Sequence, residues 1–228
     1  MADLFVKLSI IIPVLNEEKN LANTLNRLQS FRHSGHEIIV VDGGSVDNSL
    51  MLAHEGADTV LVSKTGRALQ MNSGASAASG DVLLFLHADT VLPENAAQMI
   101  LSINHGINFW GRFDVRLSSN KMIFRLIEWL MNLRSRLTAI ATGDQAIFVE
   151  RVLFEKVGGF PEIVLMEDIA FSKQLKKLSR PACLKQKVIT SSRRWENKGI
   201  VATVLLMWKL RLYYFLGVSP NKLSQLYR

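Results

Sequence analysis

The run from Asp81 to Thr90, which reads Asp-Val-Leu-Leu-Phe-Leu-His-Ala-Asp-Thr, constrains the fold of this chain more than any other segment. Its apolar part is continuous, which is typical of a strand buried on both faces of a parallel sheet. The run ends abruptly on His87-Ala88-Asp89. Because ligands of open α/β sheets bind outside the carboxyl ends of the strands, a carboxylate here is expected to meet a substrate or a metal ion.

Two more acidic positions follow the same rule. Asp42 ends the apolar strand of Val40-Val41-Asp42-Gly43-Gly44-Ser45, and Glu167-Asp168 opens a helix after a Gly-rich turn. One strand-end carboxylate is weak evidence. Three acidic positions in this order predict a single crevice lined by carboxylates.

The first hundred residues alternate short strands with single helices. Strands are predicted over residues 8–12, 37–42, 59–63 and 82–86, and helices over residues 45–55 and 67–78. A helix between the first two strands carries Leu21, Leu25 and Leu28 at helical spacing, and Asn16 is expected to cap it. This alternation predicts right-handed crossovers and an α/β fold, with a mostly parallel central sheet and helices on both faces.

Beyond Pro93 the alternation loosens. Helices are predicted over residues 94–104, 122–137, from 151 onward, 167–178 and 200–215, and strands over residues 108–115 and 145–149. The helix over residues 122–137 is amphipathic, with Ile123, Leu126, Ile127 and Leu130 on one face. We expect one domain over residues 1–228, with a nucleotide-binding half (1–105) and an acceptor-binding half (106–228) that ends in a basic helical segment.

Composition limits the compartment and the partners. Cys183 is the only cysteine, so no internal disulfide can form, and a reducing compartment such as the cytoplasm fits. The N-terminus has no secretory signal pattern, and the apolar stretch 200–216 is interrupted by Lys209 and Arg211, so no membrane span is predicted. The net charge is +7, and its basic part follows Asp168, where Glu196 is the only acid. A phosphate-rich partner and an ordinary solvated surface both explain this quarter of the chain; a nucleic acid is not expected.

Four motifs taken together resemble those of the family-2 glycosyltransferases of GT-A fold. They are Pro13-Val14-Leu15-Asn16-Glu17, Val41-Asp42-Gly43-Gly44-Ser45-Val46-Asp47, His87-Ala88-Asp89 and Glu167-Asp168. Thr142-Gly143-Asp144-Gln145-Ala146, Ser192-Arg193-Arg194-Trp195 and the His-Ala-Asp-Thr sequence are most similar to a small soluble bacterial subgroup of that family.

The resemblance implies roles for the residues near the first strands. Asp42, followed by Gly43, would hold the nucleoside of a sugar nucleotide, and Pro13, Asn16 and Glu17 would line the same pocket. The alternative is that Asp42 only caps the next turn. Arg67 and Asn72 lie in a segment that begins a helix, where backbone N–H groups favour anions and Arg67 can reach a phosphate; a purely structural helix start is the alternative.

His87-Ala88-Asp89 stands where the family has Asp-x-Asp. By resemblance, Asp89 binds a divalent cation, Mn²⁺ or Mg²⁺, that bridges the diphosphate, and these ions prefer oxygen ligands. His87 departs from the pattern, because an imidazole does not replace a carboxylate for Mg²⁺. It is expected to contact the nucleotide or to pack.

The resemblance places the reaction at Glu167-Asp168. Asp168 would deprotonate the acceptor hydroxyl in an inverting displacement, and Glu167 would orient the acceptor or the loop. The alternative is two acids that favour a helix N-terminus. Asp144 would face the sugar or acceptor, Arg194 the diphosphate, and Trp195 the sugar or acceptor; Trp195 in the core is the alternative.

These residues predict a hexosyltransferase-like enzyme that moves a sugar from a UDP- or GDP-linked donor to an unknown hydroxyl acceptor, with lipid-linked acceptors among the candidates. A sugar-phosphate nucleotidyltransferase or a dinucleotide oxidoreductase would need a Gly-rich phosphate loop after the first strand, where Pro13-Val14-Leu15-Asn16 stands instead. A non-catalytic protein of the membrane surface is the alternative from another class. This alternative is supported by Lys173, Lys176 and Lys177 and by the apolar face of helix 200–215. Together they would allow peripheral contact with an anionic inner membrane face.

Overall fold

The computed structural model describes residues 6–103 and 108–227. Its strands are β1 (Leu8–Val14), β2 (Glu37–Asp42), β3 (Thr59–Val62), β4 (Val82–Phe85), β5 (Thr90–Val91), β6 (Trp110–Leu117), β7 (Phe148–Glu150) and β8 (Ala182–Thr190). Its helices are α1 (Glu18–His33), α2 (Ser49–Gly56), α3 (Arg67–Ala77), α4 (Ala96–Ser102), α5 (Met122–Thr138), α6 (Arg151–Lys156), α7 (Glu167–Leu175), α8 (Arg193–Lys198), α9 (Ile200–Phe215) and α10 (Pro220–Tyr227), with a 3-10 turn at Gly143–Gln145.

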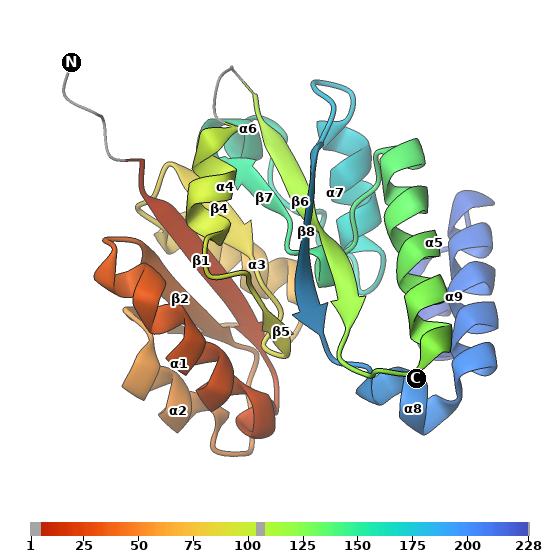
Figure 1. The fold of residues 1–228 in the computed structure, drawn as a ribbon, viewed down its shortest axis with the longest axis horizontal. Coiled ribbons are helices and arrows are strands. Elements are labelled where there is room, and N and C mark those ends of the chain that lie inside the picture. The colour runs from red at the N-terminus through yellow and green to blue at the C-terminus, as the bar shows by residue number, and fades with distance from the viewer. Residues whose placement is uncertain (1–5, 104–107, 228) are drawn as a thin grey trace.

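The strands form one sheet in the order β3-β2-β1-β4-β7-β6-β8-β5 (Figure 1). The pairs β3-β2, β2-β1, β1-β4 and β6-β8 are parallel, and β7 and β5 pair in antiparallel fashion with their neighbours. Helices cover both faces of this mostly parallel sheet. The predicted α/β architecture is therefore confirmed.

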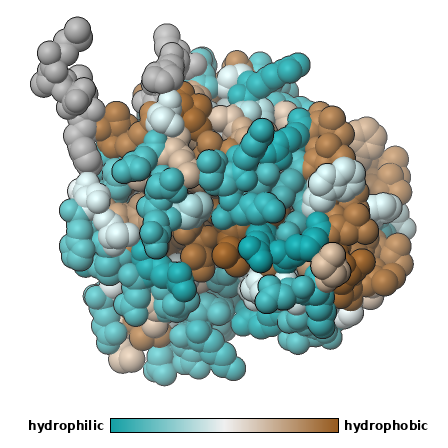
Figure 2. All heavy atoms as spheres, in the orientation of Figure 1, coloured by the Kyte–Doolittle hydropathy of each residue, from teal (hydrophilic) through white to brown (hydrophobic). Residues whose placement is uncertain are grey.

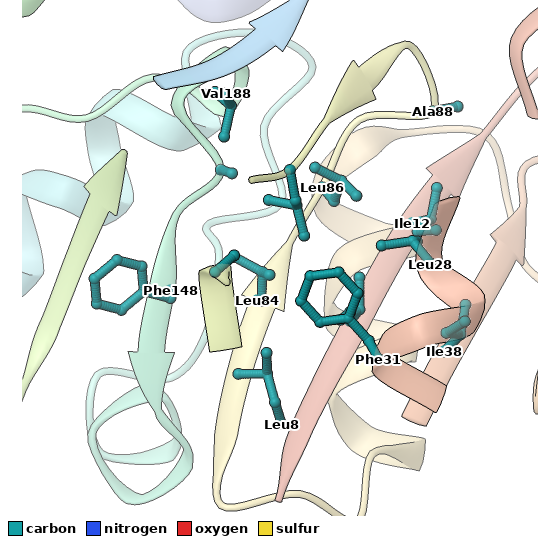
Figure 3. Close-up of a cluster of buried hydrophobic side chains, with 14 of the residues drawn as sticks. Leu8, Ile12, Leu28, Phe31, Ile38, Leu84, Leu86, Ala88, Phe148 and Val188 are labelled. Carbon is teal, nitrogen blue, oxygen red and sulfur yellow. The ribbon is translucent and has the colours of Figure 1, made fainter. Parts of the chain in front are cut away.

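Two apolar layers sandwich the central strands because successive strand residues point to opposite faces. Leu8, Ile10 and Ile12 of β1 pack toward α1, α2 and α4, and Figure 3 shows this layer, in which Leu28 and Phe31 of α1 meet the sheet. Ile11 faces the other way, into a layer that α3, α6 and α7 cover. The continuous apolar strands of the sequence thus follow from burial on both faces.

The structure corrects the expectation that Asn16 caps the first helix. Asn16 lies in the left-handed region with φ 55°, and α1 begins two residues later. The Asn16 side chain accepts a hydrogen bond from the Val46 backbone N–H at 2.9 Å instead. This contact holds residues 45–48 in a loop, so α2 begins at Ser49 and not at Ser45.

Four elements have no counterpart in the sequence prediction: β5, β8, α8 and α10. β8 was missed because its middle, Lys185-Gln186-Lys187, is polar and exposed, so its sequence has no apolar strand pattern. The edge strand β5 has only two residues. The predicted strands 108–115 and 145–149 shift to β6 and β7, since Gly143–Gln145 forms the 3-10 turn.

Helix α5 turns a largely polar side toward the protein. Glu128, Asn132 and Ser135 are buried, together with Phe124 and, from the predicted apolar face, Ile127. The other three residues of that face, Ile123, Leu126 and Leu130, are exposed. The cause is β6, which pairs with β7 only at Trp110 and Gly111, so no strand within residues 6–103 and 108–227 pairs with the rest of that edge. Side chains of α5 supply the missing hydrogen bonds, and unpaired backbone groups would otherwise be buried there.

The contacts between α5 and β6 are specific. Asn132 accepts from the Val115 N–H at 2.9 Å and donates to the Val115 carbonyl at 3.0 Å. Glu128 accepts from the Leu117 N–H at 2.7 Å and forms an ion pair with Arg125 at 2.9 Å. A helix that docks on an open strand edge must present polar groups to it, and this one does.

Candidate active site

Two adjoining cavities, each of about 330 Å³, open at the carboxyl ends of β1 and β4. They share Glu17, Arg67, His87 and Asp89, so together they form one cleft. The first cavity is lined further by Pro13, Val14, Leu15, Thr65, Gly66, Gln70 and Ala88. The second reaches across to Thr142, Gly143, Asp144, Glu167, Asp168, Arg193, Arg194, Trp195, Met207, Arg211 and Tyr227, among others. The cleft lies where the topology of an open α/β sheet predicts a ligand.

Asp42 is buried beside this cleft but does not line it. Its Oδ2 accepts from the Gly44 and Ser45 N–H groups, both at 2.9 Å, and its Oδ1 accepts from the Ser45 hydroxyl. This is the turn-capping role that the sequence left open as the alternative. Gly43 is packed under the Gln70 side chain, which a Cβ would approach to 3.0 Å. Neither residue, nor Asn16, is among the cavity walls.

Asn72 also lies outside both cavities. Its side chain donates to the Phe160 carbonyl and accepts from the Phe160 N–H, each at 2.9 Å. Both polar ends of the amide therefore serve to tie α3 to the loop before α7. This contact gives Asn72 a structural role, and its assignment to the nucleotide stays a prediction.

Asp89 and Glu17 face the shared part of the cleft. Burial raises the pKa of Asp89, and the charge of Glu17 raises it further, while Arg193 and Arg67 oppose this. Asp89 accepts a long hydrogen bond from the Thr90 hydroxyl, at 3.4 Å. Arg193 reaches Glu17 from α8 at 3.5 Å. A cation bound between Asp89 and Glu17, in addition to Arg193, would relieve the repulsion between these two carboxylates.

The donor set fits a divalent cation that a diphosphate brings with it. Among the described residues, no group of three or more His, Cys, Asp or Glu side chains is arranged to hold a metal by itself. Mg²⁺ is commonly held by one or two carboxylates together with substrate phosphates and water. Asp89 meets that requirement, with Glu17 as its neighbour in the cleft.

His87 lies where the two cavities meet and lines both of them. Its Nε2 lies so close to Gly143 that a Cβ there would approach it to 2.5 Å. Burial and the nearby Arg67 lower the pKa of His87 to about 3. The imidazole is therefore neutral at physiological pH. At position 143 any residue larger than glycine would force the His87 ring to move.

Arg67 stands at the centre of the cleft, where solvent reaches it although protein surrounds it. Burial by itself would lower its pKa, but the charges of Glu167, Tyr227, Asp168 and Asp89 raise it overall. It begins α3, as predicted, after Gly66 with φ 151°. A permanent cation between these acids suits a bound phosphate.

Glu167 and Asp168 open α7 after Met166, which takes a left-handed conformation with φ 70°. Asp168 accepts from the Gly143 N–H at 2.9 Å and from the Ile169 N–H at 2.7 Å. Burial raises the pKa of Asp168 in spite of these bonds. Burial and the charge of Asp168 raise the pKa of Glu167 to about 7. Both carboxyls thus have a pKa above its ordinary value, which suits a general base.

The loop between α5 and β7 and the helix α8 supply the far wall. Asp144 accepts from the Thr142 hydroxyl at 2.5 Å. The Arg194 guanidinium stacks 3.6 Å from the centre of the Tyr227 ring and donates to the Tyr227 carbonyl at 2.9 Å. Trp195 lines the cavity and also packs on Leu117, Phe124 and Ile127.

Sequence reasoning missed several wall residues. Gln70 donates to the Val14 and Val41 carbonyls, at 2.8 and 2.9 Å, and so joins the ends of β1 and β2. Arg193 belongs to the Arg-Arg-Trp motif and could have been found there. Met207, Arg211 and Tyr227 come from α9 and α10, and no local pattern marks them.

Comparison with known proteins agrees with this geometry. Residues 9–146 match the family described as "Glycosyl transferase family 2", which is more than half of the chain. The chain belongs to glycosyl transferase family 2.

The relatives of this chain include the uncharacterized glycosyltransferase alr2836 of Nostoc sp. strain PCC 7120, 32% identical over 105 residues. That match covers 43% of this chain and only 33% of the length of the relative. A solved structure of S. aureus TarS 1-349 in complex with UDP superposes with a TM-score of 0.66 at 20% identity, covering 81% of this chain and 60% of that one.

The mannosyltransferase PcManGT of Pyrobaculum calidifontis, in complex with GDP-Man and Mn²⁺, superposes with a TM-score of 0.62 at 18% identity. The match covers 83% of this chain and 57% of that one. The GT-A fold that the motifs implied is thereby confirmed.

Proposed function

We propose that this family-2 protein is an inverting glycosyltransferase, of hexosyltransferase type, that uses a UDP- or GDP-linked sugar. The observation that carries the proposal is one cleft that is lined by Asp89, by Glu167 and Asp168, and by Arg67 among these acids. A diphosphate needs cations and a metal ligand, and an acceptor hydroxyl needs a base; the cleft has both. The neighbours in complex with UDP, UDP-GlcNAc and GDP-Man support this donor class.

In this proposal the donor diphosphate lies along the shared part of the cleft, near Arg67 and Asp89. Asp89 would hold Mn²⁺ or Mg²⁺, with Glu17 beside it, and the cation would stabilise the departing diphosphate. Neighbours in complex with Mn²⁺ or Mg²⁺ support the choice. Arg193, which bridges to Glu17, would add positive charge at the same point.

Asp168 would take the proton from the acceptor hydroxyl. The Gly143 and Ile169 N–H groups fix its carboxylate at the cavity wall, and burial raises its pKa in spite of these bonds. We further propose that residues 1–228 act as one domain, in the cytoplasm, where the single Cys183 stays reduced.

The test of the base is Asp168→Asn. Loss of a general base should lower kcat by about 10²–10⁴-fold, because the hydroxyl then has no proton acceptor, while the Kd for UDP or GDP changes little. Nucleotide binding by calorimetry and single-turnover transfer from UDP- and GDP-sugars measure the two effects. The exposed Glu162→Gln is the matched control. Transfer within tenfold of wild type would show that Asp168 is not the base, and if Glu167→Gln alone abolishes transfer, the role belongs to Glu167.

The test of the metal is Asp89→Asn. Mn²⁺ should strengthen UDP or GDP binding at least tenfold in the wild type and should have no such effect in the variant. Titrations in Mn²⁺ and in chelator measure this. Equal affinity of the wild type under both conditions would contradict the metal role of Asp89.

A further inference from the structure

The outward side of α5 is apolar from end to end. Its exposed large apolar side chains are Met122, Ile123, Leu126, Trp129, Leu130 and Leu137. Trp129, with 58% of its surface exposed, lies in the middle of this face. Since the polar side of α5 is bound to β6, no rotation of the helix can bury these residues without breaking the bonds of Glu128 and Asn132.

The outward side of α9 repeats the pattern. Val201, Leu205, Trp208, Leu212 and Phe215 follow one another at spacings of four and three residues, which places them in one stripe. All five are exposed, from 55% for Leu212 to 79% for Phe215. The helix buries Thr203 and Leu210 on its other side.

The two helices lie at the same edge of the molecule. Near their first turns, Phe124 and Ile127 of α5 belong to one apolar cluster with Ile200 and Val204 of α9. Figure 2 shows apolar surface gathered along the edge where Figure 1 draws α5 and α9. We call the exposed residues of the two stripes together the α5–α9 face. Soluble monomers rarely expose an apolar patch of this extent unless it binds something.

The charges at the α5–α9 face are mainly positive. Glu128 is the only acid of α5 and is buried, and the chain has no acid after Glu196. Lys173, 4.9 Å from the Tyr214 ring, and Lys176, 3.3 Å from the Thr138 carbonyl, mark the far end of both helices. Lys209 lies exposed on α9, and Lys121, which precedes α5, pairs with the exposed Glu196 at 3.8 Å.

We propose that the α5–α9 face seats in the headgroup and acyl boundary of an anionic membrane. Aromatic and aliphatic side chains in the interface plane, with cations around them, are the recognition elements for such a surface. A second copy of this chain fits less well, because like cations would then meet across the contact. Among the described residues, no helix is long and apolar enough to cross a membrane.

This placement would bring the second cavity to the membrane surface. On its inner side α9 supplies Met207 and Arg211 to that cavity, and on its outer side it carries the exposed stripe. An acceptor held at the headgroup level would therefore reach the cleft from the side of Glu167 and Asp168. The docking itself does not depend on the proposed reaction, so the two can fail separately.

The experiment is co-sedimentation of the full chain with vesicles of phosphatidylcholine alone or with phosphatidylglycerol. The wild type should bind the anionic vesicles at least tenfold more tightly than the neutral ones, and high salt should weaken that binding. Trp129→Ser with Trp208→Ser should weaken it at least tenfold. The matched control, Val46→Ser with Val62→Ser, removes exposed apolar residues away from this face and should bind as the wild type does.

Thermal melts of all three proteins check that the substitutions leave the fold intact. The proposal is overturned if the wild type does not bind anionic vesicles at low salt, or if the tryptophan variant binds as well as the control. It is also overturned if sedimentation equilibrium shows a wild-type dimer that the tryptophan substitutions dissociate, since a second copy would then cover the face.

Discussion

Helices α1 and α5 are both long and amphipathic and both lie beside the sheet, yet they bury different kinds of side chain. Helix α1 buries Leu21, Leu25, Leu28 and Phe31. Helix α5 buries Glu128, Asn132 and Ser135 beside Phe124 and Ile127, and it exposes Leu126, Leu130 and Leu137. The difference is in what each helix meets: α1 packs on a sheet face, which is apolar, whereas α5 packs on an open strand edge, which is a row of hydrogen-bonding groups.

The comparison shows that an apolar stripe does not by itself identify the buried side of a helix. Burial of apolar area stabilises α1, because the sheet face offers it no better partner. For α5, leaving the buried backbone groups of β6 without hydrogen bonds would cost more free energy than burial of the exposed leucines would gain. The exposed apolar side is then available for another surface.

The largest expected effect is a difference in stability between alanine substitutions of a leucine in α1 and a leucine in α5. Leu21→Ala should lower the free energy of unfolding by about 2–5 kcal/mol, because it leaves a cavity in a fully buried site. Leu126→Ala, half exposed on α5, should change it by less than about 0.5 kcal/mol. Urea denaturation measures both, and similar losses in the two variants would refute the inverted orientation of α5.

A smaller effect should appear on the polar side of α5. Asn132→Ala should lower the free energy of unfolding by about 2–3 kcal/mol, because the Val115 N–H and carbonyl lose their partner together. The control is Asn26→Ala, an exposed asparagine of α1, which should be nearly neutral. Hydrogen exchange at Val115 should quicken in the Asn132 variant alone; unchanged exchange there would contradict the account of the open edge.

The smallest effect should distinguish two buried glutamates. Glu128 has an ion pair and a backbone donor, whereas the pKa of Glu167 is raised to about 7 from an ordinary value of 4.5, by burial first and then by Asp168. Between these two pH values the folded state keeps a proton that the unfolded state releases, so stability falls as the pH rises toward 7.

Glu167→Gln removes that dependence. Relative to the wild type, the variant should gain on the order of 1–3 kcal/mol in free energy of unfolding between pH 5 and pH 8. Urea denaturation at both pH values measures the change, with Glu162→Gln as the exposed control. If the difference between variant and wild type is the same at pH 5 and pH 8, Glu167 is not held protonated by its surroundings.

Much of the fold followed from local pattern. The bounds of α9, the start of α3 at Arg67 and the start of α7 at Glu167 were predicted and are found, because turn residues and helical periodicity specify them locally. The ends of β1, β2 and β4 were located to within two residues. The cleft at those strand ends followed from the general topology of parallel sheets.

The contacts of the individual site residues could not be predicted from local sequence pattern. Asp42 binds its own turn, and Asn72 binds Phe160, a residue 88 positions away. Arg194 stacks on Tyr227, which α10 brings back to the cleft. These contacts join segments that no spacing in the sequence connects.

The sequence by itself therefore determined the buried strands, the helix starts and the position of the acidic crevice, because each depends on neighbours within a few residues. Only the tertiary structure decided which side of α5 is buried, which carboxylates face the cleft, and which apolar residues stay in solvent. Those outcomes depend on what lies opposite a side chain in space. For α5 the opposite element is a strand edge that lacks its neighbour beyond Gly111.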